Sequence, residues 1–156
     1  MKFMIHGGIL SRSLQSISGV VPSGKALPIL LNYHLKLNET DLTITASDSE
    51  TTISVKLHLE NVDANGLTEV TIPAKIFSEI VRKLPDNDVT IETDATFKTV
   101  ISCEKAKFNI IGKSGDDFSY LPYIEKNDSI VMSQFTLKEV IRQTIFSISD
   151  NDNNRL

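Results

Sequence analysis

Apolar residues recur with the same helical spacing in three parts of the chain. Each set occupies positions i, i+1, i+4, i+5 and i+8, the apolar stripe of a short amphipathic helix. The sets start at Ile9, Ile76 and Val140, which are 67 and 64 positions apart. Their members are Ile9, Leu10, Ser13, Leu14 and Ile17; Ile76, Phe77, Ile80, Val81 and Leu84; and Val140, Ile141, Thr144, Ile145 and Ile148. The spacing predicts three helices.

Residues beside the second and third stripes indicate where those helices begin and end. Pro73 suits the first turn of the second helix, where its missing N–H costs nothing, and Pro85 forces that helix to stop. Thr136 is expected to cap the third helix, with Glu139 three residues later as in a capping box.

Alternating apolar and polar residues predict strands around the helices. A β-like run precedes each helix, at residues 2–5, 69–72 and 130–135. Three runs follow the first helix, at 30–37, 42–46 and 52–59, and three follow the second, at 89–93, 97–103 and 107–111. Turn-prone links at 38–41, 48–50, 94–96 and 104–105 join them as hairpins. The repeating unit is therefore β-α-β-β-β, about 65 residues long.

Two copies of this unit can complete a domain that one copy cannot. A single unit has a helix on one face of its sheet and exposed strand edges, whereas two units can pair edge to edge and cover a shared sheet with two helices. We therefore expect an α+β domain over residues 1–125, with repeats at about 1–65 and 66–125 and the helices on one face of antiparallel sheets. Residues 126–156 are expected to be the opening strand and helix of a further, truncated copy.

The composition fits an intracellular globular protein. The 156 residues are 40% hydrophobic and 23% charged, which suffices for one well-buried domain. The apolar runs are too short to span a bilayer, and the N-terminus lacks the pattern of a signal peptide. Together with one cysteine, Cys103, these features predict a cytoplasmic protein without a membrane partner.

Residues 19–26, GVVPSGKA, fall one residue short of a phosphate-binding P-loop. Ala26 replaces the hydroxyl residue that would bind Mg²⁺. A P-loop also needs a strand before it and a helix starting at its lysine, but here a predicted helix precedes the loop and a β-like run follows Pro28. A helix-to-strand connector is favoured. A nucleotide-binding phosphotransferase built on Gly24 and Lys25 is the enzyme alternative, and Lys25 as an exposed loop cation is a third interpretation.

No catalytic or metal-binding pattern emerges from the other reactive residues. The three histidines, His6, His34 and His58, lack the spacing of metal ligands. Acidic pairs such as Asp116 and Asp117 fit turns. The sequence therefore predicts no enzyme activity, no metal and no cofactor.

Positive charge is concentrated on the predicted helices. Residues 9–18, 73–84 and 136–149 carry +1, +2 and +1, so the rest of this −4 chain carries −8. The basic residues concerned are Arg12, Lys75, Arg82, Lys83, Lys138 and Arg142. Charge alone favours ordinary solvated helix faces; the functional alternative is a cationic strip facing DNA phosphates. Because the chain has no Trp, duplex backbone is a better target than stacked bases. A module that binds proteins through strand edges, without DNA, is a further alternative.

Short motifs in order along the whole chain carry a family resemblance. They are MKF at the start, LQSISG at 14–19, LPIL at 27–30, IPAK at 72–75 with Phe77, KLP at 83–85, DF at 117–118, LP at 121–122 and FS at 146–147. With these motifs the chain resembles the N-terminal part of bacterial DNA polymerase III β subunits, the sliding clamps.

The resemblance implies an architecture and a function. Members of that family are more than twice this length and carry three similar domains, each a doubled version of the unit above. Two chains close head to tail into a homodimeric ring, whose helices line a hole around double-stranded DNA. The ring tethers the polymerase, as a processivity factor without chemistry of its own. Polymerase and clamp-loader subunits bind a cleft in later domains, which this chain lacks.

The resemblance also implies DNA-binding positions. Lys75 stands where the family has a basic residue of the lumen. Lys25 lies in a loop where some members place a DNA-contacting Arg one residue earlier, the place that Gly24 holds here. Asn151 matches a DNA-proximal amide, and Asp150 stands where a histidine can precede that amide. From their helix phase we add Arg12, Arg82, Lys83, Lys138 and Arg142.

Overall fold

A computed structural model describes residues 1–23, 27–60, 62–64, 66–116, 118 and 130–148. The chain divides into two units, Met1–Pro122 and Tyr123–Leu156. No helix among the described residues has the length and apolar character needed to cross a bilayer.

The strands of the first unit lie close to the positions that the alternating pattern predicts. They are β1 Lys2–His6, β2 Asn32–Asn38, β3 Asp41–Ser47, β4 Thr52–His58, β5 Val62–Asp63, β6 Glu69–Pro73, β7 Asp88–Thr93, β8 Lys98–Cys103 and β9 Ala106–Ile111. Two differences stand out. The short strand β5 has no counterpart in the prediction, and the start of the run at 30–37 belongs to a 3₁₀ turn, Pro28–Leu31.

The strands form antiparallel sheets, which confirms the predicted fold class, but there are two of them rather than one sheet shared by the repeats. One has the order β5-β1-β7-β8-β9 and the other β4-β3-β2-β6. A bridge between Thr71 and Lys113 joins them. The repeats exchange their first strands, because β1 pairs with β7, with Phe3 opposite Ile91, and β6 pairs with β2, with His34 opposite Thr71. Each repeat therefore needs the other to complete its sheet.

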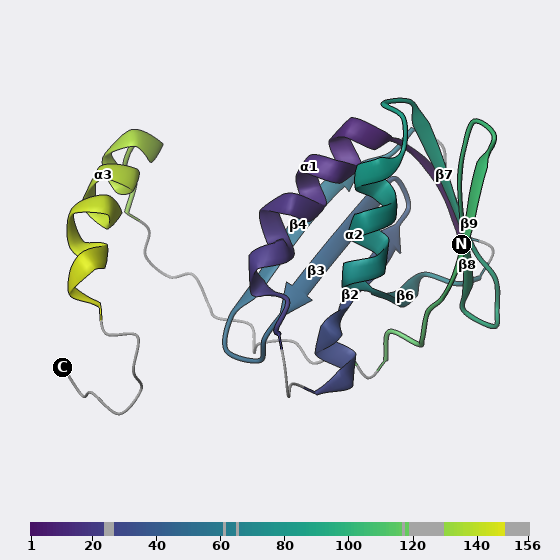
Figure 1. Ribbon diagram of the computed structural model, residues 1–156, viewed down its shortest axis with the longest axis horizontal. Coiled ribbons are helices and arrows are strands. Elements are labelled where there is room, and N and C mark those ends of the chain that lie inside the picture. Colours follow the sequence, from purple (N-terminus) through teal and green to yellow (C-terminus); the bar gives the residue numbers. More distant parts are fainter. Residues whose placement is uncertain (24–26, 61, 65, 117, 119–129, 149–156) are drawn as a thin grey trace. The chain divides into compact units, whose positions relative to one another are not determined.

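Two helices connect strands of one sheet to strands of the other, and they lie side by side. They are α1 Gly7–Ile17 and α2 Ala74–Lys83. Besides contacting each other, α1 packs on β3 and β4 and α2 on β2 and β6, so both cover the four-stranded sheet (Figure 1). Pro85 ends α2 as predicted, since Leu84 before it is extended. Pro73 is the last residue of β6, one place before the helix rather than in its first turn.

The core side of each helix is narrower than the predicted stripe. Leu10 and Leu14 of α1 and Phe77 of α2 are buried, but Ile9 and Ile76 are 44% and 52% exposed. The first buried residues are instead the small Gly7 and Ala74, which let each helix start close to its neighbours. The apolar spacing therefore predicts one buried residue too many in α1, Ile9, and one too many in α2, Ile76.

The second unit contains α3, Gln134–Thr144, followed by a 3₁₀ turn, Ile145–Ser147. Its N-cap is Ser133, whose Oγ accepts a hydrogen bond from the Thr136 N–H at 3.0 Å, so the predicted cap at Thr136 is one turn late. The strand predicted at 130–135 is also wrong, because 130–133 have no regular structure and the helix follows. A helix satisfies its own backbone groups, whereas a strand needs a neighbouring strand.

Candidate nucleic-acid interface

The solvent-facing side of α2 carries three cations, Lys75, Arg82 and Lys83, all exposed. Lys75 lies two residues before the buried Phe77, and Lys83 two residues after the buried Val81. Residues two apart on a helix point in directions about 200° apart, so both lysines point away from the core. Arg82 lines the side of α2 that faces α1.

The neighbouring helix α1 adds Arg12 to the same layer. Arg12 lies two residues from both Leu10 and Leu14, which are buried, so its side chain also points away from the core, and it is exposed. Both helices pack on the same sheet through their apolar sides. Their outward sides therefore face solvent together, which brings Arg12, Lys75, Arg82 and Lys83 onto one surface.

A groove of about 530 Å³ runs between the two helices. The side chains that line it come from both helices and from the sheet below. They include Ser11, Gln15 and Ser18 from α1 and the 3₁₀ turn that follows it, Lys75, Ser78, Glu79 and Arg82 from α2, and Tyr33 from β2. The Tyr33 hydroxyl lies 3.1 Å from Ser78 Oγ, and burial raises the pKa of Tyr33. The groove thus offers uncharged hydrogen-bonding groups between cations.

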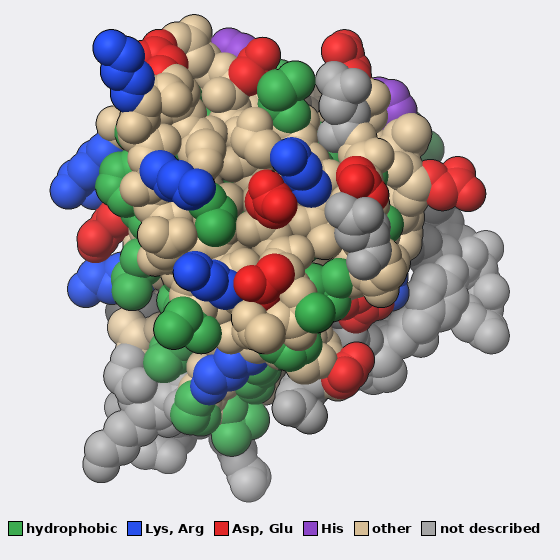
Figure 2. Space-filling model, turned by 90° about the vertical axis from the view of Figure 1, so that its right-hand side faces the viewer, with side chains coloured by type: hydrophobic (Ala, Val, Ile, Leu, Met, Phe, Trp, Pro, Cys, Tyr) green, Lys and Arg blue, Asp and Glu red, His purple; other side chains and the backbone are tan. Residues whose placement is uncertain are grey.

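The cations on α1 and α2 have no carboxylate partner among the described residues. Several lysines of the sheets do, since Lys36 Nζ lies 2.5 Å from a Glu69 oxygen and Lys56 Nζ 2.7 Å from an Asp41 oxygen. Figure 2, which views the side of the β7–β8–β9 sheet, shows Lys and Arg mixed with Asp and Glu. The helix surface therefore keeps positive charge available for an external anion.

The remaining predicted site residues belong to the second unit or lie outside the described residues. Lys138 and Arg142 are exposed on α3 of the second unit. Arg142 Nη2 lies 2.8 Å from Glu139 Oε2, so its charge is partly compensated within the helix. Gly24, Lys25 and Asn151, with Asp150, lie outside the described residues.

The order of elements around residues 19–26 is the reverse of a P-loop. The helix α1 and a 3₁₀ turn, Ser18–Val20, come before the segment, and a second 3₁₀ turn and β2 follow. No α-helix starts among the described residues 27–38, so the helix N-terminus with which a P-loop holds phosphates is not found there. The connector interpretation agrees with this order.

The histidines take structural roles. His34 is buried, 3.2 Å from Glu69 Oε2 and stacked on Phe118, and burial lowers the pKa of its ring. His6 accepts a hydrogen bond from the Gly8 N–H at the start of α1, and His58 contacts Asp41. Among the described residues, no His, Cys, Asp and Glu side chains gather in a way that could hold a metal ion.

Sequence reasoning missed the groove itself. Ser11 and Gln15 are four residues apart, as are Lys75 and Glu79, so helical spacing could have indicated two polar sides. Nothing in the sequence places Tyr33 beneath them, because that contact depends on how β2 packs under α2.

Two interlocked β-α-β-β-β repeats, with two adjacent basic helices over one sheet, define a DNA-clamp fold. Residues 1–122 match the family described as "DNA polymerase III beta subunit, N-terminal domain". The chain therefore belongs to the DNA polymerase III beta subunit family.

Individual relatives agree with this assignment. The beta sliding clamps of Bacillus subtilis and Halalkalibacterium halodurans are 34% and 31% identical to it, over 97% of this chain and 42% and 41% of their own lengths. A crystal structure from Eubacterium rectale, described as a DNA polymerase III beta subunit, superimposes with a TM-score of 0.88 at 55% identity, over 99% of this chain and 42% of that one. For the sliding clamp structure from Bacillus subtilis the TM-score is 0.87 at 32% identity, over 97% and 41%. The chain thus spans about two fifths of the length of these relatives.

Proposed function

We propose that this chain is the N-terminal part of a processivity factor, a non-catalytic protein that encircles duplex DNA, slides along it and tethers the replicative polymerase in the cytoplasm. One observation carries the proposal. Arg12, Lys75, Arg82 and Lys83 share one solvent-facing surface of two adjacent helices and have no ion-pair partner among the described residues.

The chemistry of this surface suits the DNA backbone. Lysine and arginine bind phosphate without reading sequence, and such contacts weaken as salt rises. Backbone-only binding has dissociation constants of about 10⁻⁴–10⁻⁶ M at physiological salt, which permits rapid exchange between phosphates. A closed ring does not need tighter binding, because topology keeps it on the DNA.

The greater length of the relatives supports a proposal for the wider assembly. We assign residues 1–125 to a first clamp domain and 126–156 to the start of a second, whose further strands would cover the exposed apolar stripe of α3. In the complete protein two chains form a head-to-tail ring, and polymerase and clamp-loader subunits bind later domains. Gly24, Lys25, Lys138, Arg142 and Asn151 would add DNA contacts to those of the first two helices.

The test is a charge reversal in a full-length clamp whose first 156 residues are this chain. Lys75→Glu with Arg82→Glu is expected to lower processivity and DNA retention, because two phosphate-binding cations become anions. The slope of the logarithm of the binding constant against the logarithm of the salt concentration should decrease in magnitude by about one for each residue changed. Ring assembly, measured by sedimentation, should be unchanged, because both side chains are exposed.

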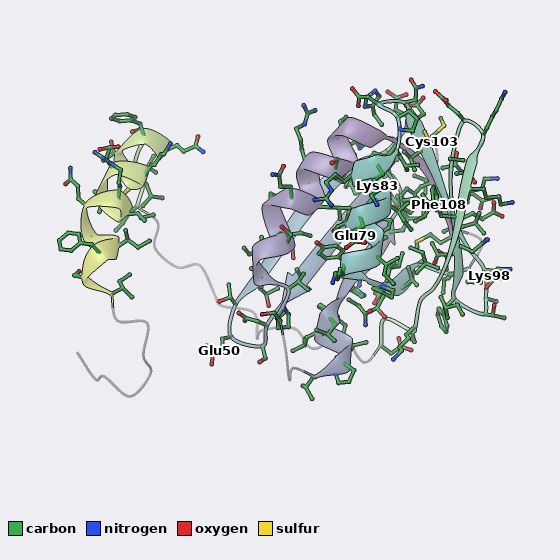
Figure 3. The ribbon with its side chains drawn as sticks, in the orientation of Figure 1. Glu50, Glu79, Lys83, Lys98, Cys103 and Phe108 are labelled. Atoms are coloured by element: carbon green, nitrogen blue, oxygen red, sulfur yellow. The ribbon has the colours of Figure 1, made fainter. Side chains whose placement is uncertain are left out.

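The matched control is Lys98→Glu with Lys105→Glu. It makes the same change in net charge on β8 and on the turn that follows, away from the helices (Figure 3 labels Lys98). The proposal requires that this control retain processivity. Equal losses in both double variants, or no loss in the helix variant, would contradict the assignment of the helix surface to DNA.

A further inference from the structure

An anion stands at the centre of the exposed side of α2. Glu79 lies two residues from both Phe77 and Val81, which are buried, so it points directly away from the core. It also lines the groove together with Lys75 and Arg82. Figure 3 shows Glu79 and Lys83 on successive turns of the helix.

Glu79 does not neutralise its cationic neighbours within the described structure. It is four residues from Lys75 and Lys83 and three from Arg82, spacings that allow ion pairs on a helix. None of these pairs forms. On α3 the corresponding pair does form, between Glu139 and Arg142 at 2.8 Å. A phosphate that approaches the cations of α2 therefore also meets an unpaired carboxylate.

We propose that Glu79 is a counter-charge that limits how tightly the helix surface binds each DNA phosphate and so speeds sliding. This inference rests on the proposed DNA-binding function. A phosphate bound to Lys75 or Arg82 would lie within about one helical turn of Glu79, where repulsion between like charges is only partly screened at physiological salt.

The uncharged groups of the groove complement this effect. Ser11, Gln15 and Ser78 can donate hydrogen bonds to a phosphate oxygen over a short range only. Cations attract the DNA backbone from a distance, and Glu79 lowers the affinity with which a phosphate is held at each binding position. During sliding, each phosphate has to leave one binding position before it occupies the next. Weaker binding at each position therefore gives faster movement along the DNA.

The test compares Glu79→Gln with wild type in the 156-residue chain, titrated with a short DNA duplex and followed by NMR. Removing the carboxylate charge is expected to lower the dissociation constant about threefold at low salt, and the difference should shrink as salt rises. In a full-length clamp with this chain as its N-terminal part, the same substitution should slow one-dimensional diffusion on DNA by a similar factor.

Glu50→Gln is the matched control, because Glu50 is exposed on the turn between β3 and β4 and lies outside the groove lining (Figure 3). It removes the same charge, and its affinity should equal that of wild type. Equal tightening in both variants would show that total charge is responsible and would overturn the inference. So would an unchanged affinity of Glu79→Gln. If wild type shows no binding, the proposed function fails as well.

Discussion

Phe77 is the residue whose loss should most weaken the attachment of α2 to the sheet. Its side chain is fully buried, and its ring meets that of Tyr33 edge-on, with 6.5 Å between centroids and 69° between planes. Phe77→Ala leaves a cavity at this contact, and such substitutions cost about 3–5 kcal/mol, part of it from the aromatic pair. Domains of this size have free energies of unfolding of about 5–15 kcal/mol, so we expect a folded but much weaker protein.

Ile76→Ala is the matched control, one residue earlier in the same helix. Ile76 is 52% exposed, so its truncation should cost about 1 kcal/mol or less. Because the chain has no Trp, urea unfolding is best followed by far-UV circular dichroism. With a slope of about 2 kcal/mol/M, the midpoint should fall by about 2 M for Phe77→Ala and by at most about 0.5 M for Ile76→Ala. Similar losses in the two variants would refute the packing described for α2.

Two further substitutions test other parts of the fold. A methyl group added at Gly112 would lie 2.7 Å from the Thr71 carbonyl oxygen, so Gly112→Ala should lower the free energy of unfolding by about 2 kcal/mol or more. Gly19 has open space around it, so Gly19→Ala should change the free energy of unfolding little. Equal urea midpoints for the two variants would contradict this difference. Burial lowers the pKa of His34 in the folded protein, although the carboxylate of Glu69 opposes this shift. Between about pH 6.5 and the lowered folded-state pKa, the unfolded chain therefore binds more protons than the folded protein. The free energy of unfolding should fall as the pH drops through this range. In His34→Gln the urea midpoint should lose less than wild type between about pH 7.5 and about pH 5.5, and an identical loss would argue against this role of His34.

Local pattern predicts the elements well where a short segment decides its own conformation. The alternation in residues 52–59 gives β4, and the extended conformation that Pro85 imposes on Leu84 gives the end of α2. Pairing between strands is different, because β1 carries an alternation that several strands could accept. Besides the short strand β5, its partner is β7 of the other repeat, with Phe3 opposite Ile91, and no short-range signal specifies that choice. The exchange of strands, and the division of the strands into two sheets, therefore could not be predicted from local pattern.

The third repeat shows how context changes a local pattern. Residues 130–135 form a β-like run, but they pair with no described strand, and Ser133 caps a helix instead. At the candidate site, helical phase was enough to place Lys75 and Arg82 on an outward surface. The groove beside them was not predictable, because one of its lining residues, Tyr33, comes from a strand that is far from α2 in the sequence.

The most direct test of the central claim is to map duplex DNA onto the isotope-labelled chain by NMR chemical-shift perturbation. We predict that the perturbed amides cluster on the outward sides of α1 and α2, around Arg12, Lys75 and Arg82. The pattern should be the same for duplexes of different sequence and should fade between about 50 and 200 mM salt. Perturbations confined to the β7–β8–β9 sheet, or binding that survives high salt, would contradict the claim that these two helices hold the DNA backbone.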